Sequence, residues 1–270
     1  MAAASDTLLN TPEIEVWPAR LLRARNNRDA RRLAQSTHVL RRKRDGLYLA
    51  TVGHAGVAFL QPRFRHEPGV AVALRALDAF RAQRRTGVDA IATLPVTGLQ
   101  ERLAALGLDD GYGQRSGLPL VAEPERLAFA GSDRYRRALW LLPGAARAWT
   151  HLRDEARRDG VPLDAISGYR NHDYQLGIFE RKRARGLPVD EILRVNAAPG
   201  YSEHHSGRAL DLGTNDEPPA EESFERTAAF AWLRENAGGH GFVMSYPRDN
   251  PHGIVYEPWH WCWTPAPVTD

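Results

Sequence analysis

Residues 202–211 read SEHHSGRALD, and the second half of this stretch has the alternation of a short strand. A period of two places Leu210 and Leu212 on one face and Asp211 on the other, beside a small residue. The leucines are expected to pack into a core, whereas a buried carboxylate needs a partner. We therefore expect the side of the strand that carries Asp211 to hold a polar site.

A histidine in the loop before this strand can reach the same point. His204 precedes Asp211 by seven residues, and Gly207 lies between them and lets the chain bend. Adjacent side chains project in different directions, so the spacing favours His204 over His205 as the partner of the aspartate. Zinc takes about four ligands and keeps one position for water at catalytic sites, so a third protein ligand is expected elsewhere.

The stretch YEPWHWCW, residues 256–263, offers that third ligand and a base. His260 lies on a predicted strand, with Cys262 on the same face, where the thiol is expected to pack as a small hydrophobe. Glu257 lies three residues before the histidine, and Pro258 favours a kink that lets the carboxylate turn back toward a metal. A carboxylate beside metal-activated water is the general base that a metallohydrolase needs.

Two spaced motifs carry a resemblance to a known family. SEHHSGRALD fits the pattern S-x-H-x-x-G-x-A-x-D, and EPWH fits E-x-W-H. Together they resemble the zinc D-alanyl-D-alanine carboxypeptidases and dipeptidases of the VanY/VanX kind, as do the segments ISGYR, YQL, GFVMSYP and GIVYEPWHW. The superfamily also includes L-alanyl-D-glutamate endolysins and the zinc domain of hedgehog signalling proteins. The resemblance covers roughly residues 120–265.

The resemblance implies a role for individual residues. It makes His204, Asp211 and His260 the ligands of one Zn2+ ion and Glu257 the catalytic base. It gives Arg170 the task of stabilising the developing oxyanion or of holding a substrate carbonyl or carboxylate, for which a permanent planar donor is suited. A weaker carry-over makes Ser202 a substrate-binding residue. Three more residues can line the pocket or simply pack in the core or on a helix surface: Tyr169, Gln175 and Tyr246.

The implied reaction is hydrolysis of a peptide bond at the D-amino acids of a peptidoglycan stem peptide. A D-alanyl-D-alanine (D,D-) carboxypeptidase is the first expectation. An L,D-carboxypeptidase and an L-alanyl-D-glutamate endolysin are the enzymatic alternatives, because the motifs do not fix which bond is cut. A binding or signalling module that keeps zinc without turnover is the alternative from another class. The presence of both Glu257 and Arg170 favours an enzyme.

Helices precede mostly strands with short connections in the C-terminal part, which predicts an α+β fold with a small antiparallel sheet flanked by helices. The Gly-rich stretch near residue 115 suggests a boundary. We expect residues 1–115 to form an N-terminal α+β accessory region of unknown function and residues 116–270 to form the zinc peptidase-like catalytic domain. Helices are predicted from Pro18 into the thirties and over 70–85, 99–106, 131–142, 143–160, 172–186 and 227–241. Strands are predicted within 46–62, around a turn at 53–56, and over 163–170, 208–213, 242–247, 253–258 and 259–263.

Composition bounds the class of protein. The 270 residues have a net charge of only +3 and a single cysteine, so no internal disulfide can form and a zinc site of several cysteines is excluded. A local basic cluster could meet phosphates, but a solvated helix face is the more common cause, so a nucleic-acid partner is not expected. The cluster consists of Arg20, Arg23, Arg25, Arg28, Arg31, Arg32, Arg41, Arg42, Lys43 and Arg44.

No apolar run approaches the ~18 residues of a membrane span. The first residues, MAAASDTLLN, have neither a basic nor an apolar region typical of a signal peptide. The expectation is therefore a protein of the cytoplasm that trims muropeptides, or one that reaches the cell wall by another route, as lysis proteins do. The sequence does not indicate an oligomeric state.

Overall fold

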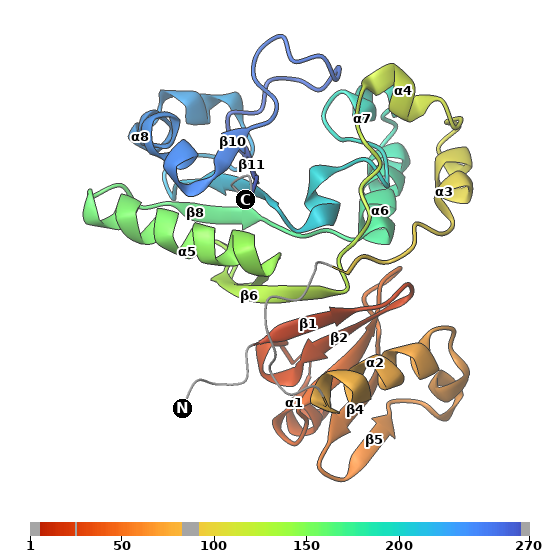
Figure 1. The fold of residues 1–270 in the computed structure, drawn as a ribbon. Coiled ribbons are helices and arrows are strands. Elements are labelled where there is room, and N and C mark those ends of the chain that lie inside the picture. Colours follow the sequence, from red (N-terminus) through yellow and green to blue (C-terminus); the bar gives the residue numbers. More distant parts are fainter. Residues whose placement is uncertain (1–5, 25, 83–91, 266–270) are drawn as a thin grey trace, which may run out of the picture. The chain divides into compact units, whose positions relative to one another are not determined.

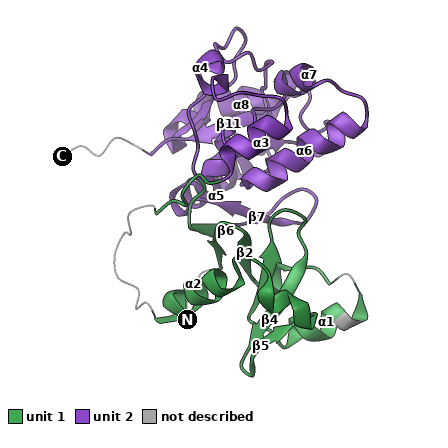
Figure 2. Cartoon of the chain, turned by 90° about the vertical axis from the view of Figure 1, so that its right-hand side faces the viewer, with its two compact units in different colours: residues 1–97, 123–129 green, residues 98–122, 130–270 purple. Residues whose placement is uncertain are grey.

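The chain forms two compact units in the computed structural model, coloured separately in Figure 2. The structure describes residues 6–24, 26–82 and 92–265. Unit 1 consists of residues 1–97 and 123–129, and unit 2 consists of residues 98–122 and 130–270. The chain therefore passes into unit 2, returns to unit 1 for one short segment, and leaves it again. The boundary expected near residue 115 falls inside the first segment of unit 2.

Unit 1 contains most of a seven-stranded sheet with the strand order β5-β4-β3-β2-β1-β6-β7, in which the neighbouring strands from β5 to β6 pair antiparallel. Residues 130–132 of β6 and all of β7 (Ala138–Leu141) belong to unit 2. The strands are β1 (Thr7–Asn10), β2 (Ile14–Pro18), β3 (His38–Arg42), β4 (Tyr48–Gly53), β5 (Gly56–Phe59) and β6 (Arg126–Ser132). The helices are α1 (Asn27–Ala34) and α2 (Val70–Ala82), with short 3-10 turns at Ala19–Leu21 and Pro62–His66. The buried face of α2, with Ala73 and Leu77, packs with Val16 and Leu40 of the sheet into one core.

Of the elements predicted within unit 1, the strand pair and the second helix are confirmed and the first helix is not, whereas β1, β2, β3 and β6 were not predicted. The hairpin of β4 and β5 confirms the predicted strand pair, and α2 confirms a helix from residue 70; residues 83–85 of that prediction lie outside the described residues. The helix predicted from Pro18 is wrong at its start. Pro18 ends β2 and pairs with His38 of β3, and α1 begins nine residues later, where Asn26 accepts a hydrogen bond from the Asp29 amide at 2.9 Å. Sheet pairing thus overrides the preference of proline for a first helical turn.

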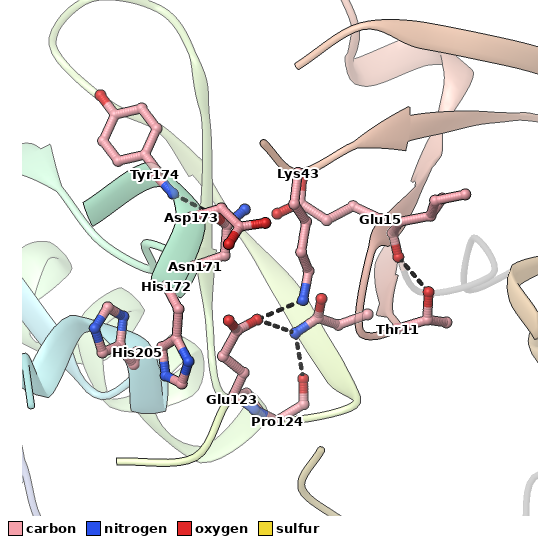
Figure 3. Close-up of polar contacts among 12 residues, drawn as sticks. Thr11, Glu15, Lys43, Glu123, Pro124, Asn171, His172, Asp173, Tyr174 and His205 are labelled. Carbon is pink, nitrogen blue, oxygen red and sulfur yellow. Dashed lines mark hydrogen bonds and ion pairs between the residues drawn. The ribbon is translucent and has the colours of Figure 1, made fainter. Parts of the chain in front are cut away.

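A buried ion pair attaches the returning segment to the sheet of unit 1. Lys43 Nζ lies 2.6 Å from Glu123 Oε2, and their side chains are only 2% and 7% exposed. Figure 3 shows Lys43 beside the Glu123 carboxylate. Asn10 donates to the same carboxylate oxygen at 3.0 Å and to the carbonyl of Pro124 at 2.9 Å. These contacts satisfy two charges inside the unit, which is the condition for burying them.

Acidic side chains accompany the basic cluster of residues 20–44. Arg41 pairs with Glu15 at 2.7 Å, and Arg42 pairs with both Asp45 and Glu67 at 2.6 Å. Arg25 and the side chain of Arg28 lie outside the described residues. The described part of the cluster is therefore a surface of mixed charge.

Unit 2 contains a four-stranded antiparallel sheet with the order β10-β11-β9-β8, and helices lie around it (Figure 1). The strands are β8 (Asp164–Ser167), β9 (Ala209–Gly213), β10 (Phe242–Met244) and β11 (His260–Trp263). The helices are α3 (Leu99–Ala105), α4 (Tyr112–Ser116), α5 (Pro143–Arg158), α6 (His172–Ala184), α7 (Val189–Leu193) and α8 (Ala228–Asn236). This arrangement confirms the expected α+β class with a small antiparallel sheet. Among the described residues, the helices are too short or too polar to cross a bilayer.

Two local predictions in unit 2 are wrong for identifiable reasons. The helix predicted over 131–142 is instead the end of β6, a turn, and strand β7 (Ala138–Leu141). The carboxylate of Asp133 accepts the amides of Tyr135 and Arg137 at 2.9 and 2.8 Å and stabilises that turn. The segment 253–258 has no strand; it is held by isolated backbone bonds, such as Val255 N to the Arg194 carbonyl at 2.8 Å.

Two helix starts in unit 2 have a local cause that is visible in the sequence. Pro143 occupies the first turn of α5, whose buried face carries Trp149 and Leu152. Asn171 caps α6 by accepting a hydrogen bond from the amide of Tyr174 at 2.7 Å (Figure 3). The cap fixes the start of the helix that lies directly after Arg170, and so it helps to position that arginine.

Candidate metal and catalytic site

The register of the small sheet brings an aspartate and a histidine face to face. β9 and β11 pair antiparallel with Asp211 directly opposite His260. Asp211 Oδ1 lies 3.1 Å from His260 Nδ1, and both side chains are almost fully buried. Leu210 and Leu212 have no exposed surface, so the strand turns its apolar residues to the core and its carboxylate to the histidines.

A third group comes from the short turn that precedes β9. His204 lies in the 3-10 turn Glu203–Ser206, which ends at Gly207 with a φ of 68°, a left-handed conformation that favours glycine. The turn places His204 Nε2 3.3 Å from Asp211 Oδ1. One ligand atom from each of His204, Asp211 and His260 lies within 4.8 Å of the others.

The outer ring nitrogens of both histidines are held by acceptors. His204 Nδ1 donates to the carbonyl of Gly168 at 2.7 Å, and His260 Nε2 lies 2.8 Å from Glu203 Oε2. A carbonyl can only accept, so the proton of His204 is on Nδ1 and the lone pair is on Nε2. That Nε2 is buried and makes no hydrogen bond to any described residue.

These observations fit a zinc ion. Metal-ligating histidines characteristically give their other ring N–H to a carbonyl or carboxylate, as both do here. Two imidazole nitrogens and one carboxylate oxygen form a donor set that catalytic zinc sites use, with one position left for water. The buried Nε2 of His204 is the polar atom that such an ion would satisfy.

The electrostatics of the group favour a positive charge at its centre. Burial opposes ionisation of Asp211, but the nearby His204, His260 and Arg170 side chains hold its pKa well below the usual range. Burial also opposes a charge on His260, yet its hydrogen bonds to Asp211 and Glu203 raise its pKa to about 10. Burial, followed by the charge of Arg170, lowers the pKa of His204 to about 4, so this imidazole is neutral.

Glu257 lies beside the group, in the turn that leads into β11. Its amide donates to the carbonyl of Tyr246 at 3.0 Å, its own carbonyl accepts the amide of His260 at 3.1 Å, and its carboxylate lies 3.8 Å from His260 Nδ1. Burial raises the pKa of Glu257 to about 7, with the charge of Asp211 adding to the effect. A carboxyl group with a pKa near neutrality can both accept and return a proton.

Arg170 reaches the group from the segment after β8. Its guanidinium lies 3.6 Å from Asp211 Oδ2, and its buried Nε makes no hydrogen bond to any described residue. Its backbone is fixed on both sides: the amide donates to the carbonyl of His204 at 3.2 Å, and the carbonyl accepts from His205 Nδ1 at 2.7 Å. His205 also accepts the amide of Gly200 at Nε2, so both of its ring nitrogens are used and it lies outside the three-residue group.

A cavity of about 260 Å³ opens onto these side chains. Gln175, Ser202 and Tyr246 line it, whereas Tyr169 is not among the described residues that do. Gln175 donates to the carbonyl of Ala197 at 2.8 Å, and its buried Oε1 makes no hydrogen bond to a described residue. The other lining residues are Arg170, Lys182, Val195, Asn196, Ala197, His204, Asp211, Ala220, Ile254, Val255, Glu257, Trp259 and His260.

Two residues of this site were missed in the sequence. Glu203 stands at a variable position inside the motif, and nothing in its spacing marks it as the partner of His260. Lys182 lines the cavity from α6, seven residues after Gln175. Two helical turns separate these two side chains, so the helical period could have placed Lys182 on the same face.

Comparison with known proteins points to one family. The sequence model of VanY, described as D-alanyl-D-alanine carboxypeptidase, matches residues 139–266, a range that contains every residue of this site. The D-alanyl-D-alanine carboxypeptidase of Enterococcus faecium is 35% identical over 126 residues, which are 45% of this chain and 37% of that protein. The Bacillus subtilis (strain 168) protein YodJ is 36% identical over 121 residues, 43% of each chain. The chain thus spans less than half the length of these two relatives.

A third relative is covered over most of its length. The bifunctional D-Ala-D-Ala dipeptidase and D-Ala-D-Ala carboxypeptidase VanXYC of Enterococcus gallinarum is 30% identical over 153 residues, which are 54% of this chain and 77% of that protein. Among solved structures, the LdcB LD-carboxypeptidase has 29% identity and a TM-score of 0.46, over 49% of this chain and 64% of that one. The extent of the VanXYC match, together with the VanY match over the whole site, shows that the chain belongs to the VanY D-alanyl-D-alanine carboxypeptidase family.

Proposed function

We propose that the protein is a zinc-dependent metallopeptidase that hydrolyses peptide bonds at the D-amino acids of peptidoglycan stem peptides, first of all a D-alanyl-D-alanine carboxypeptidase. The observation that carries this proposal is one cavity that joins a three-ligand group to a carboxylate and a guanidinium. Membership of the VanY family supports the same substrate class.

The cofactor of this proposal is one zinc ion held by His204 Nε2, the Asp211 carboxylate and His260 Nδ1. Bound zinc supplies Lewis acidity, which polarises a carbonyl and makes water more acidic. The protein contributes oriented imidazoles, because the carbonyl of Gly168 and the carboxylate of Glu203 hold the outer ring nitrogens.

Glu257 is proposed to move the proton. Its carboxylate takes the proton of the attacking water and passes it to the leaving amine, and the raised pKa of Glu257 suits both transfers. Arg170 is proposed to donate to the carbonyl oxygen as negative charge develops there, because its Nε is buried without a hydrogen bond to a described residue. Ser202, Gln175 and Tyr246 are proposed to line the substrate pocket. Tyr169 is proposed to have a packing role instead.

The size of the cavity favours the end of a peptide over its middle. About 260 Å³ is small for a ligand site and accommodates one or two small residues. The proposed substrate is therefore a stem peptide or muropeptide with a D-amino acid at its free end. Action on the cell wall or on released fragments is equally compatible with this chemistry.

Mass spectrometry of defined stem peptides after incubation with the zinc-loaded protein tests the proposal. We expect release of one D-alanine from a pentapeptide, and loss of that activity after chelation or in Glu257→Gln. Release of D-alanine only from a tetrapeptide would identify an L,D-carboxypeptidase, and cleavage between L-alanine and D-glutamate would identify an endolysin. A protein that binds zinc and cleaves none of these peptides would be a binding module, and the enzyme proposal would be wrong.

A further inference from the structure

The cavity contains a cation without a partner among the described residues. The chain has only two lysines, Lys43 and Lys182. Lys43 is buried in its ion pair with Glu123. Lys182 is half-buried and lines the cavity, and its ammonium group forms neither a hydrogen bond nor an ion pair with any residue that the structure describes.

Helix α6 aims Lys182 at the site. Gln175, Phe179 and Lys182 follow each other at intervals of four and three residues, so they share one face of the helix. Phe179 has no exposed surface and Gln175 only 1%, which fixes this face inward. Seven residues of helix rise about 10 Å, so Lys182 extends the polar wall away from Gln175 by about that distance.

The charges around the cavity leave Lys182 as the available cation. Arg170 already has Asp211 within 3.6 Å, and His260 has Asp211 and Glu203 as hydrogen-bond partners. Burial, followed by the charges of Arg185 and Arg170, lowers the pKa of Lys182, while the charge of Glu257 raises it. A half-buried ammonium group loses solvation without gaining an ion pair to a described residue. An anionic ligand would compensate for this lost solvation.

We infer that Lys182 binds a carboxylate of the substrate and is a specificity-determining residue of this pocket. The inference rests on the proposed peptidase function, since it concerns the same cavity. Two groups of a stem peptide have this chemistry. One is the C-terminal carboxylate of the released residue, and the other is a side-chain carboxylate on the acyl side of the bond, as a diamino-dicarboxylic acid carries.

The test measures peptide affinity in the zinc-loaded Glu257→Gln protein, where the peptide stays intact. Three peptides are compared: one with both carboxylates, one with the side-chain carboxylate amidated, and one with the C-terminus amidated. Lys182→Met is expected to weaken binding of the first peptide about tenfold, as loss of a charge-assisted contact does, and Lys182→Arg to retain most of it. Arg181→Met removes a neighbouring charge from the same helix and is expected to bind like the parent protein.

When the carboxylate that Lys182 binds is amidated, the proteins with Lys and with Met at position 182 are expected to bind the peptide with equal affinity. The peptide that gives this result identifies which of the two carboxylates Lys182 binds. The inference is overturned if Lys182→Met leaves all three affinities unchanged, or weakens all three equally, or if Arg181→Met has the same effect. Thermal unfolding of each variant separates loss of binding from loss of fold. Failure of the proposed function looks different: the protein with Glu257 intact then cleaves no stem peptide, whatever residue stands at 182.

Discussion

At the scale of single residues, Glu203 is the most informative side chain of the site. It does not belong to the three-ligand group, yet its carboxylate holds His260 Nε2 at 2.8 Å and thereby turns Nδ1 toward Asp211. Burial opposes its charge, but the hydrogen bond and charge of His260 lower the pKa of Glu203 to about 2. The carboxylate is therefore ionised at neutral pH and is a strong acceptor for the imidazole N–H.

We predict that Glu203→Gln weakens zinc binding by about 10–100-fold, the usual effect of losing the carboxylate behind a histidine ligand. The amide is nearly the same size, so the fold should persist while the acceptor becomes weaker. Competition with a chromogenic chelator measures the affinity. Glu235→Gln, which changes an exposed carboxylate on α8, is the matched control. Zinc affinity equal to that of the parent protein would show that Glu203 does not position His260.

His38 of unit 1 gives a prediction for pH. Burial, followed by the charge of Arg81, lowers its pKa from 6.5 to about 4. The unfolded chain therefore binds more protons than the folded one between these two values, and stability is lost as the pH falls through this window. We expect the urea midpoint to fall between pH 7 and pH 4.5, and to fall less in His38→Gln. Equal pH dependence in the two proteins would contradict this assignment.

At the scale of elements, several predictions that rested on a local signal are confirmed, although the helix predicted from Pro18 is not. A few adjacent residues are enough to predict the cap and period of α6, the proline start of α5 and the alternation of β9. Residues 131–142 have the composition of a helix, but Asp133 bonds two amides of a tight turn and the chain continues as β7. A side chain that bonds its own backbone competes with the helix, and composition does not reveal which arrangement wins.

The residues of the site were likewise predictable where the sequence signal was local. The motifs indicated the residues that lie together on β9, β11 and the preceding turn, because their spacing follows from strand phase. Glu203 and Lys182 were missed because their roles depend on what the fold places opposite them. Tyr169, a pocket candidate, is not among the described residues that line the cavity; it adjoins Arg170, and adjacent side chains project in different directions.

The start of α6 provides a prediction at this scale. Asn171→Ala removes the acceptor of the Tyr174 amide, so we expect the free energy of unfolding to fall by about 1 kcal/mol, the typical loss for a helix cap. Asn171→Ser supplies another capping oxygen and should recover most of the loss. Urea denaturation followed by circular dichroism measures both variants. An alanine variant as stable as the parent protein would mean that the cap contributes nothing to this helix.

At the scale of the whole molecule, the chain forms two compact units, and only one of them holds the residues of the proposed site. All the residues of the proposed site belong to unit 2, and the VanY match begins at residue 139. Unit 1 has its own core and its own buried ion pair, in which Glu123 comes from the segment that returns from unit 2. The ion pair of Lys43 and Glu123 is thus a local test of whether unit 1 depends on that return.

We predict that Lys43→Met destabilises the protein by about 3–5 kcal/mol, because it leaves the Glu123 carboxylate buried without its counter-charge. The double variant Lys43→Met with Glu123→Leu removes both charges and should recover most of this loss, since an apolar pair of similar volume can replace a buried ion pair. Urea denaturation of the two single variants and the double variant gives the coupling energy. Zinc affinity should stay unchanged in all three, because the proposed ligands belong to unit 2. A Lys43→Met protein as stable as the parent would show that the pair does not hold the returning segment, and a loss of zinc affinity would show that the site depends on unit 1.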